Sequence, residues 1–147
     1  MSLVKTTTVT WDGNLSFDGV CGSGHTVRMD GVGNVTGFSP MELVLVGLAG
    51  CTGMDVIDIL QKKRQAVDGL AINVRGTQSE EHPKVYTDIE IEYVVRGRDI
   101  DARAVDRAIT LSQTKYCPVS AMLGKAATIR CSYRIEADQS EAESAPA

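Results

Sequence analysis

The sequence lacks the basic charge that binding to nucleic acid requires. Its net charge is −4, and four of its 19 acidic residues lie in residues 136–147, which contain no base. The remaining 15 acids are balanced by 15 bases. Because a nearly neutral body offers no clustered basic surface for a phosphate backbone, we expect no nucleic-acid partner.

The sequence also lacks a long apolar run. The longest one, residues 43–51, falls far short of the roughly 20 residues that cross a bilayer. The opening residues, MSLVKTTTVTWDG, contain no apolar core of a signal peptide. We therefore expect a cytoplasmic protein with no membrane partner. Residues 1–136 are expected to form a single domain, and the Ala/Ser/Glu-rich residues 137–147 a disordered acidic tail.

Metal-binding and common catalytic motifs are missing as well. The four cysteines include no CxxC pair, and only two histidines are present. Cys21 and His25 are two candidate zinc ligands without two obvious companions, so we expect neither a metal nor another cofactor. There is no C-x5-R, G-x-S-x-G or H-E-x-x-H motif, and the glycine-rich residues 31–38 lack the order of a dinucleotide fingerprint. In a reducing compartment, the four cysteines are not expected to form a disulfide framework.

The chain that remains alternates between strand and helix patterns. Strands are predicted in residues 3–11, 14–19 and 24–30, with an Asp12-Gly13 turn between the first two. A long helix of about 25 residues follows from residue 40, then alternating strands in residues 69–80 and 84–97. A helix in residues 99–116, a short helix from residue 118 and a strand in residues 128–137 complete the chain. This order predicts an α+β domain with a largely antiparallel sheet.

The start of the long helix is well marked. Ser39 can cap it, Pro40 suits its first position, and Glu42 completes a Ser-x-x-Glu capping box. We therefore expect this helix to begin at residue 40.

Cys51 lies in the middle of this helix and has two interpretations. A free cysteine is often a small buried residue of the core. However, Gly47, Gly50 and Gly53 surround it, and each costs up to about 1 kcal/mol in a helix relative to alanine. Such glycines indicate close approach of another backbone or of a substrate, or alternatively tight packing between helices.

The charges near Cys51 argue against strong activation of the thiol. Asp55 and Asp58 follow it by one and two helical turns, and a carboxylate beside a thiol disfavours the thiolate. A cation would have to offset the negative charges of these carboxylates, and Arg28 is a candidate.

Cys117 is the second cysteine of interest. Pro118 suits the first position of a helix, which makes Cys117 the expected N-cap, with its sulfur facing the positive helix end. That environment favours a thiolate, although cysteine is also simply tolerated before proline. Cys131 alternates with Ile129 and Tyr133 in a predicted strand and is expected in the core.

Two segments, SPMELVLVGLAGCTGMDVIDIL and SQTKYCPVSAML, resemble the OsmC/Ohr superfamily, most closely its YhfA-like branch. The resemblance implies an intertwined α+β homodimer, with antiparallel sheets packed on a long central helix. It also implies a thiol-dependent peroxidase that reduces organic hydroperoxides, or hydrogen peroxide, without a cofactor. Cys51 would be the peroxidatic thiol, Cys117 the resolving thiol, and an external dithiol the reductant.

The sequence departs from the Ohr and OsmC pattern at two positions. The acidic residue found ten positions before the first cysteine is here Met41, so Glu42, one position nearer, is the candidate for that role beside its capping role. The first strands carry no arginine in residues 9–17, so Arg28 is the nearest candidate for the activating cation. These departures leave an alternative open: a non-catalytic OsmC-like dimer that binds a small apolar or thiol-containing ligand.

Overall fold

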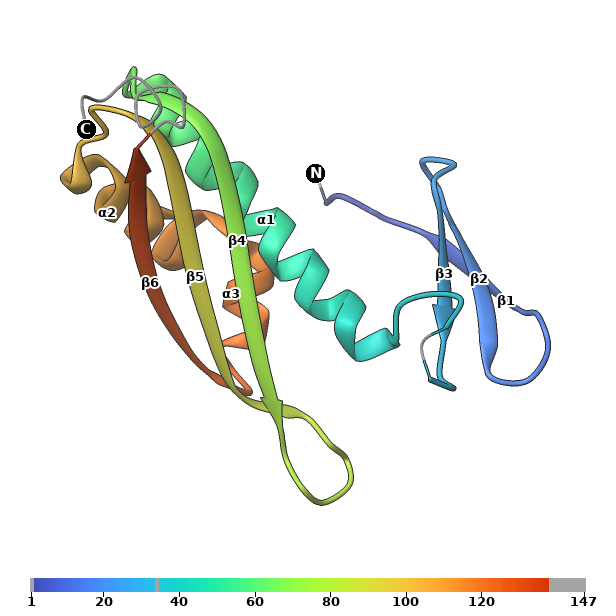
Figure 1. Ribbon diagram of the computed structural model, residues 1–147. Helices are drawn as coiled ribbons and strands as arrows, with labels where there is room; N and C mark the ends of the chain where they lie inside the picture. Colours follow the sequence, from blue (N-terminus) through green and yellow to red (C-terminus); the bar gives the residue numbers. More distant parts are fainter. Residues whose placement is uncertain (1, 34, 138–147) are drawn as a thin grey trace, which may run out of the picture. The chain divides into compact units, whose positions relative to one another are not determined.

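The chain forms an α+β structure in which every predicted helix and strand is present. The computed structural model describes residues 2–33 and 35–137, which group into two compact units divided between Val44 and Leu45. The elements are β1 (Thr7–Trp11), β2 (Ser16–Cys21), β3 (Thr26–Asp30), α1 (Pro40–Lys62), β4 (Ala66–Gln78), β5 (Tyr86–Arg98), α2 (Ala102–Leu111), the π-helical turn η1 (Ser112–Tyr116), α3 (Pro118–Leu123) and β6 (Thr128–Ala137) (Figure 1). Ala137, the first residue of the expected tail, ends β6, and the rest of that tail lies outside the described residues.

The first unit contains the antiparallel sheet β1-β2-β3, as predicted. The glycine-rich segment after β3 is a loop that folds back on Asp30. The Val32 amide donates to one oxygen of this buried carboxylate at 2.8 Å, and the Thr36 hydroxyl donates to the other at 2.8 Å. These hydrogen bonds lower the pKa of Asp30, first through the Val32 amide and then through the Thr36 hydroxyl. The loop is therefore a structural turn, in agreement with its lack of a nucleotide-binding pattern.

Helix α1 begins with the expected capping box. The Ser39 amide donates to a Glu42 carboxylate oxygen at 2.9 Å, and the Glu42 amide donates to the Ser39 hydroxyl at 3.1 Å. Four residues spaced one turn apart form its buried stripe: Leu48, Thr52, Val56 and Leu60. This stripe is narrow for so apolar a helix, and other apolar side chains of α1 remain exposed.

The second sheet has the order β4-β5-β6 and lies beside α1 (Figure 1). β4 and β5 are antiparallel and β5 and β6 are parallel, so three of the four strand pairings in the two sheets are antiparallel, in agreement with the predicted largely antiparallel sheet. The segment α2–η1–α3 connects β5 to β6. Because this helical connection is a crossover and not a hairpin, the chain returns in the direction of β5. The face of β5 that carries Ile89, Ile91 and Tyr93 is buried.

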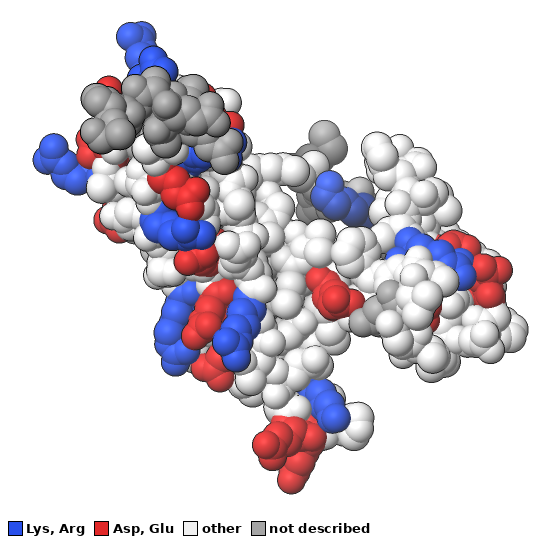
Figure 2. Space-filling model, in the orientation of Figure 1, with Lys and Arg blue, Asp and Glu red and all other residues white. Residues whose placement is uncertain are grey.

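The opposite face of this sheet carries alternating charges over its three strands. β5 contributes a column of acids, and its neighbours contribute the bases. Arg130 of β6 lies 3.5 Å from Asp88, and Arg134 lies 3.7 Å from Glu92. Figure 2 shows the interleaved red and blue side chains. Exposed pairs of this kind contribute roughly 0–1 kcal/mol each to stability, so the buried face supplies most of the sheet's stability.

Candidate active site

The fold brings Cys51 and Cys117 into contact. Cys117 caps α3 as predicted: its backbone is extended, and its sulfur accepts the Ser120 amide at 3.4 Å. Cys51 lies half-buried on α1, where its thiol interacts with the Cys117 side chain and with the backbone amide of Val119. Cys117 itself is only 4% exposed. Two thiols from helices far apart in sequence therefore meet at the first turn of α3.

The surroundings of Cys51 favour its protonated form. Desolvation is the largest cause that raises the pKa of Cys51, followed by the hydrogen bond with Cys117. The negative charge of Asp55 raises it further, while the Val119 amide opposes these effects. Because the thiolate is the reactive form of cysteine, this thiol needs a further positive group before it can act as a nucleophile at neutral pH.

A buried hydrogen-bond network lies next to the two thiols. It joins Thr52 and Asp55 of α1, Tyr93 of β5, and Ser112 and Gln113 of η1. The Ser112 hydroxyl donates to Asp55 at 2.9 Å, and the Thr52 hydroxyl lies 2.7 Å from both the Ser112 and Tyr93 hydroxyls. The Gln113 amide donates to the Thr52 and Tyr93 hydroxyls at 3.2 and 3.1 Å. Burial raises the pKa of Tyr93, so its hydroxyl stays protonated over the physiological range.

Comparison with known proteins identifies the family of this fold and site. The family model for OsmC-like protein matches residues 31–132. Protein YhfA of Escherichia coli is 43% identical over 129 residues, which cover 88% of this chain and 96% of YhfA. The chain belongs to the OsmC-like family.

Solved structures agree with this assignment. The OsmC-like chain superposes with a TM-score of 0.85 and 34% identity on a hypothetical protein from Aquifex aeolicus, covering 93% of this chain and 99% of that one. The organic hydroperoxide resistance protein OhrB of Bacillus subtilis shares the fold with a TM-score of 0.62 at 16% identity, covering 90% of this chain and 98% of that one. At 16% identity the likeness to OhrB shows a shared fold.

The other two site candidates of this OsmC-like chain lie in the unit that ends at Val44. One terminal nitrogen of Arg28 donates to Asp12 at 2.8 Å and to Asp18 at 3.0 Å. These hydrogen bonds, led by the one to Asp12, raise the pKa of Arg28. Glu42 takes part in the capping box. The predictions that Arg28 and Glu42 act on Cys51 stay predictions.

The remaining cysteines of the OsmC-like chain are exposed. Cys21 ends β2, and the nearby His25 ring instead pairs with the Ser23 hydroxyl at 3.0 Å. Within residues 2–33 and 35–137, no three His, Cys, Asp or Glu side chains gather as metal ligands. Cys131 was expected in the core, but it lies exposed on the edge strand β6, where it contacts the Tyr93 hydroxyl. The expectation failed because an edge strand has only one neighbour to cover it.

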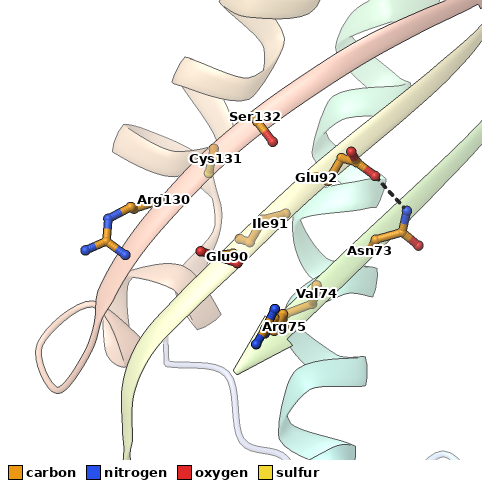
Figure 3. Close-up of a pocket in the computed structure, with 9 residues that line it drawn as sticks. All are labelled: Asn73, Val74, Arg75, Glu90, Ile91, Glu92, Arg130, Cys131 and Ser132. Carbon is orange, nitrogen blue, oxygen red and sulfur yellow. Dashed lines mark hydrogen bonds between the residues drawn. The ribbon is translucent and has the colours of Figure 1, made fainter. Parts of the chain in front are cut away.

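Two surface grooves flank the second sheet of this OsmC-like chain. The first, of about 500 Å³, follows the β4-β5-β6 sheet (Figure 3). The Asn73 amide in it donates to Glu92 at 3.0 Å, and neither Cys51 nor Cys117 lines it. The second groove, of about 600 Å³, is apolar. Its lining consists of Val46, Ala49, Gly50, Gly53, Met54 and Ile57 of α1, with Leu70 and Ile72 of β4. This groove includes Gly50, the residue before Cys51.

Proposed function

We propose that this protein is a thiol-dependent peroxidase that reduces organic hydroperoxides, or hydrogen peroxide, through Cys51 and Cys117. The contact between these two thiols at the start of α3 is the observation that carries the proposal. Membership of a family related to organic hydroperoxide resistance proteins supports it. The proposed location is the cytoplasm, where both thiols start reduced.

The proposed cycle needs only the two sulfurs and an external dithiol. The Cys51 thiolate attacks one oxygen of the peroxide, the O–O bond breaks, and the other oxygen leaves and takes up a proton as alcohol. Cys51 then carries a sulfenic acid. The Cys117 sulfur attacks it, a disulfide forms and the hydroxyl leaves as water after protonation. An external dithiol reduces this disulfide by thiol–disulfide exchange and is itself oxidised to a disulfide.

An organic peroxide fits this site better than a very polar substrate. The apolar groove of α1 contains Gly50, and a Cβ atom added at Gly47 or Gly50 would meet nothing within 4 Å. Neither thiol lines this groove, but the helix that carries Cys51 is apolar, which favours an alkyl group over a strongly solvated one.

The protein is further proposed to act as a homodimer. Helix α1 has the length and composition of a membrane-crossing helix, a test that core helices of soluble proteins also pass. Only 22% of its most apolar window is buried within one chain, and Met54 is 74% exposed. An apolar helix with so much open surface is stabilised by a partner, and a second copy of α1 offers a matching apolar face.

Arg28 is the proposed source of the positive charge that Cys51 needs. Replacing Arg28 with alanine is expected to raise the pKa of Cys51 and to shift its reactivity to higher pH, because a nearby cation favours the thiolate. The rate of Cys51 alkylation is measured against pH for the wild type, Arg28→Ala and Arg28→Lys. The lysine variant is the charge-preserving control. An unchanged profile in Arg28→Ala contradicts this role.

Peroxide turnover tests the proposed function directly. With dithiothreitol present, the reduced protein is expected to consume cumene hydroperoxide continuously. Without reductant, it is expected to reduce one equivalent of cumene hydroperoxide and to end as the Cys51–Cys117 disulfide. Peroxide loss is followed by a colorimetric assay, and the disulfide by mass spectrometry of unreduced peptides. The proposal is rejected if the protein shows no turnover and forms no such disulfide with either cumene hydroperoxide or hydrogen peroxide.

A non-catalytic binding module is the second candidate. The raised pKa of Cys51 and the apolar groove favour it, since a protonated thiol on a helix that also lines an apolar groove suits reversible ligand binding. Binding of a small alkyl thiol without any peroxide-dependent disulfide would support this alternative.

A further inference from the structure

The buried hydroxyl network connects the two segments that carry the reactive thiols. On α1, Thr52 directly follows Cys51, and Asp55 lies one turn further. On the other side, the Ser112 hydroxyl contacts both of these residues, at 2.7 and 2.9 Å. The Ser112 carbonyl accepts the backbone amide of Cys117 at 2.8 Å. Ser112 therefore touches the helix of Cys51 with its side chain and the backbone of Cys117 with its main chain.

The direction of the hydrogen bonds in this network is fixed. Ser112 has one hydroxyl proton, and it goes to the Asp55 carboxylate, which can only accept. The bond between Thr52 and Ser112 must then use the proton of Thr52. The Tyr93 hydroxyl consequently donates to Thr52, which also accepts the Gln113 amide. The hydroxyls of Ser112, Thr52 and Tyr93 therefore each donate once and accept at least once, so the network has a single low-energy arrangement of its protons.

The segment that holds Cys117 needs such an anchor. Residues 112–116 form a π-helical turn, a geometry that is rare and less favourable than the α-helix it interrupts. Ser112 and Thr52 are completely buried, so neither hydroxyl can exchange its partner for water. A disulfide tolerates only a narrow range of separations and angles, and small displacements of reacting groups slow a reaction strongly.

We infer that Ser112, held by Thr52 and Asp55, is a positioning residue that sets the geometry of Cys117 against Cys51. The inference deepens the proposed function, because this geometry governs the step in which Cys117 attacks the Cys51 sulfenic acid. The geometry can also be measured without peroxide. Oxidised glutathione forms the same disulfide from the two thiols and is reduced to two molecules of glutathione.

The test is a redox titration in mixtures of reduced and oxidised glutathione. A Cys21→Ser, Cys131→Ser background leaves only the two relevant thiols, and acid-quenched samples are analysed for the Cys51–Cys117 disulfide. Ser112→Ala is expected to lower the equilibrium constant for disulfide formation by about tenfold, which is about 30 mV for this two-electron couple. Thr52→Val is expected to act in the same direction, while Thr52→Ser, which keeps the hydroxyl, restores the wild-type value.

Tyr93→Phe is the matched control. It removes a buried hydroxyl from the same network, at an end that lies outside the path between the two cysteines. Its equilibrium constant is expected to stay within about twofold of wild type, a change of less than 0.5 kcal/mol. The inference is overturned if Ser112→Ala and Thr52→Val shift the constant no more than Tyr93→Phe does.

Folding and peroxide chemistry are checked separately. Denaturant unfolding shows whether each variant is folded, and if Ser112→Ala is not, the pair Thr52→Val and Thr52→Ser decides the question. Cumene hydroperoxide turnover by the wild type decides the proposed function alone. If the wild type does not consume peroxide, but Ser112→Ala still lowers the equilibrium constant for disulfide formation with glutathione, the peroxidase function is rejected and the positioning role of Ser112 is kept.

Discussion

Cys51→Ser is expected to reduce peroxide turnover by at least about a hundredfold, as loss of a catalytic nucleophile does. Serine keeps the size of the side chain, but its hydroxyl does not break an O–O bond. Cys117→Ser is expected to behave differently: without an external dithiol, the variant completes one reaction with peroxide and then stops as a Cys51 sulfenic acid. Without the second sulfur, excess peroxide drives Cys51 on to sulfinic acid, which an external dithiol does not reverse.

The two outcomes are separated by the chemical state of Cys51. A dimedone-type probe labels sulfenic acid, and mass spectrometry of the intact protein detects sulfinic acid by its added oxygens. Cys21→Ser and Cys131→Ser serve as controls because both residues are exposed and neither contacts Cys51 in the described chain. Equal turnover in Cys51→Ser and in the wild type would place the chemistry elsewhere.

Met54→Asp is expected to convert the proposed dimer into a monomer. Met54 is an exposed apolar residue of α1 that lines the apolar groove. If a second copy covers this face, the substitution buries a carboxylate without a partner, which costs roughly 3–5 kcal/mol. This corresponds to an increase in the dimer dissociation constant of about 150- to 5,000-fold. Sedimentation equilibrium of the wild type and the variant measures it.

Met122→Asp is the matched control for the dimer. Met122 is 64% exposed on α3 and does not line the apolar groove, so the substitution adds the same charge at a similarly open methionine outside that face. It is expected to leave the dissociation constant unchanged. A wild type that sediments as a monomer at micromolar concentration contradicts the dimer, as does a Met54→Asp variant that stays dimeric.

Local sequence signals were sufficient for most of the fold. Ser39, Pro40 and Glu42 fixed the start of α1. Pro118 correctly placed Cys117 at the N-cap of α3. These predictions hold because capping residues satisfy backbone groups only a few positions away, so they depend little on the rest of the chain.

Features that depend on tertiary structure were not predicted. Nothing local in residues 128–137 indicates that β6 pairs parallel with β5, because strand direction follows from the crossover that precedes it. The same applies to the exposure of Cys131 at a sheet edge. The π-helical turn was assigned to a continuous helix, since its wider winding is selected by contacts with Thr52 and Asp55.

The sequence predicted only part of the candidate site. Cys51 and Cys117 were found from their helix and pre-proline contexts, but the network beside them was missed. One signal was available: Thr52 occupies the same four-residue spacing as Leu48, Val56 and Leu60. A polar residue in a buried apolar stripe requires a hydrogen-bond partner, and the search for that partner leads to Ser112 and Tyr93.

The charges on the open face of the second sheet have a consequence for how its strands find one another. From Asp88 to Glu92, β5 presents only acids on this face, while Arg75 of β4 and Arg130 of β6 lie opposite Glu90. Two acidic β5 strands placed side by side would repel, and so would the arginines if β4 met β6 directly. Charge sign thus identifies the middle strand of the sheet, and it opposes both a wrong strand order during folding and mispairing between chains that are still unfolded.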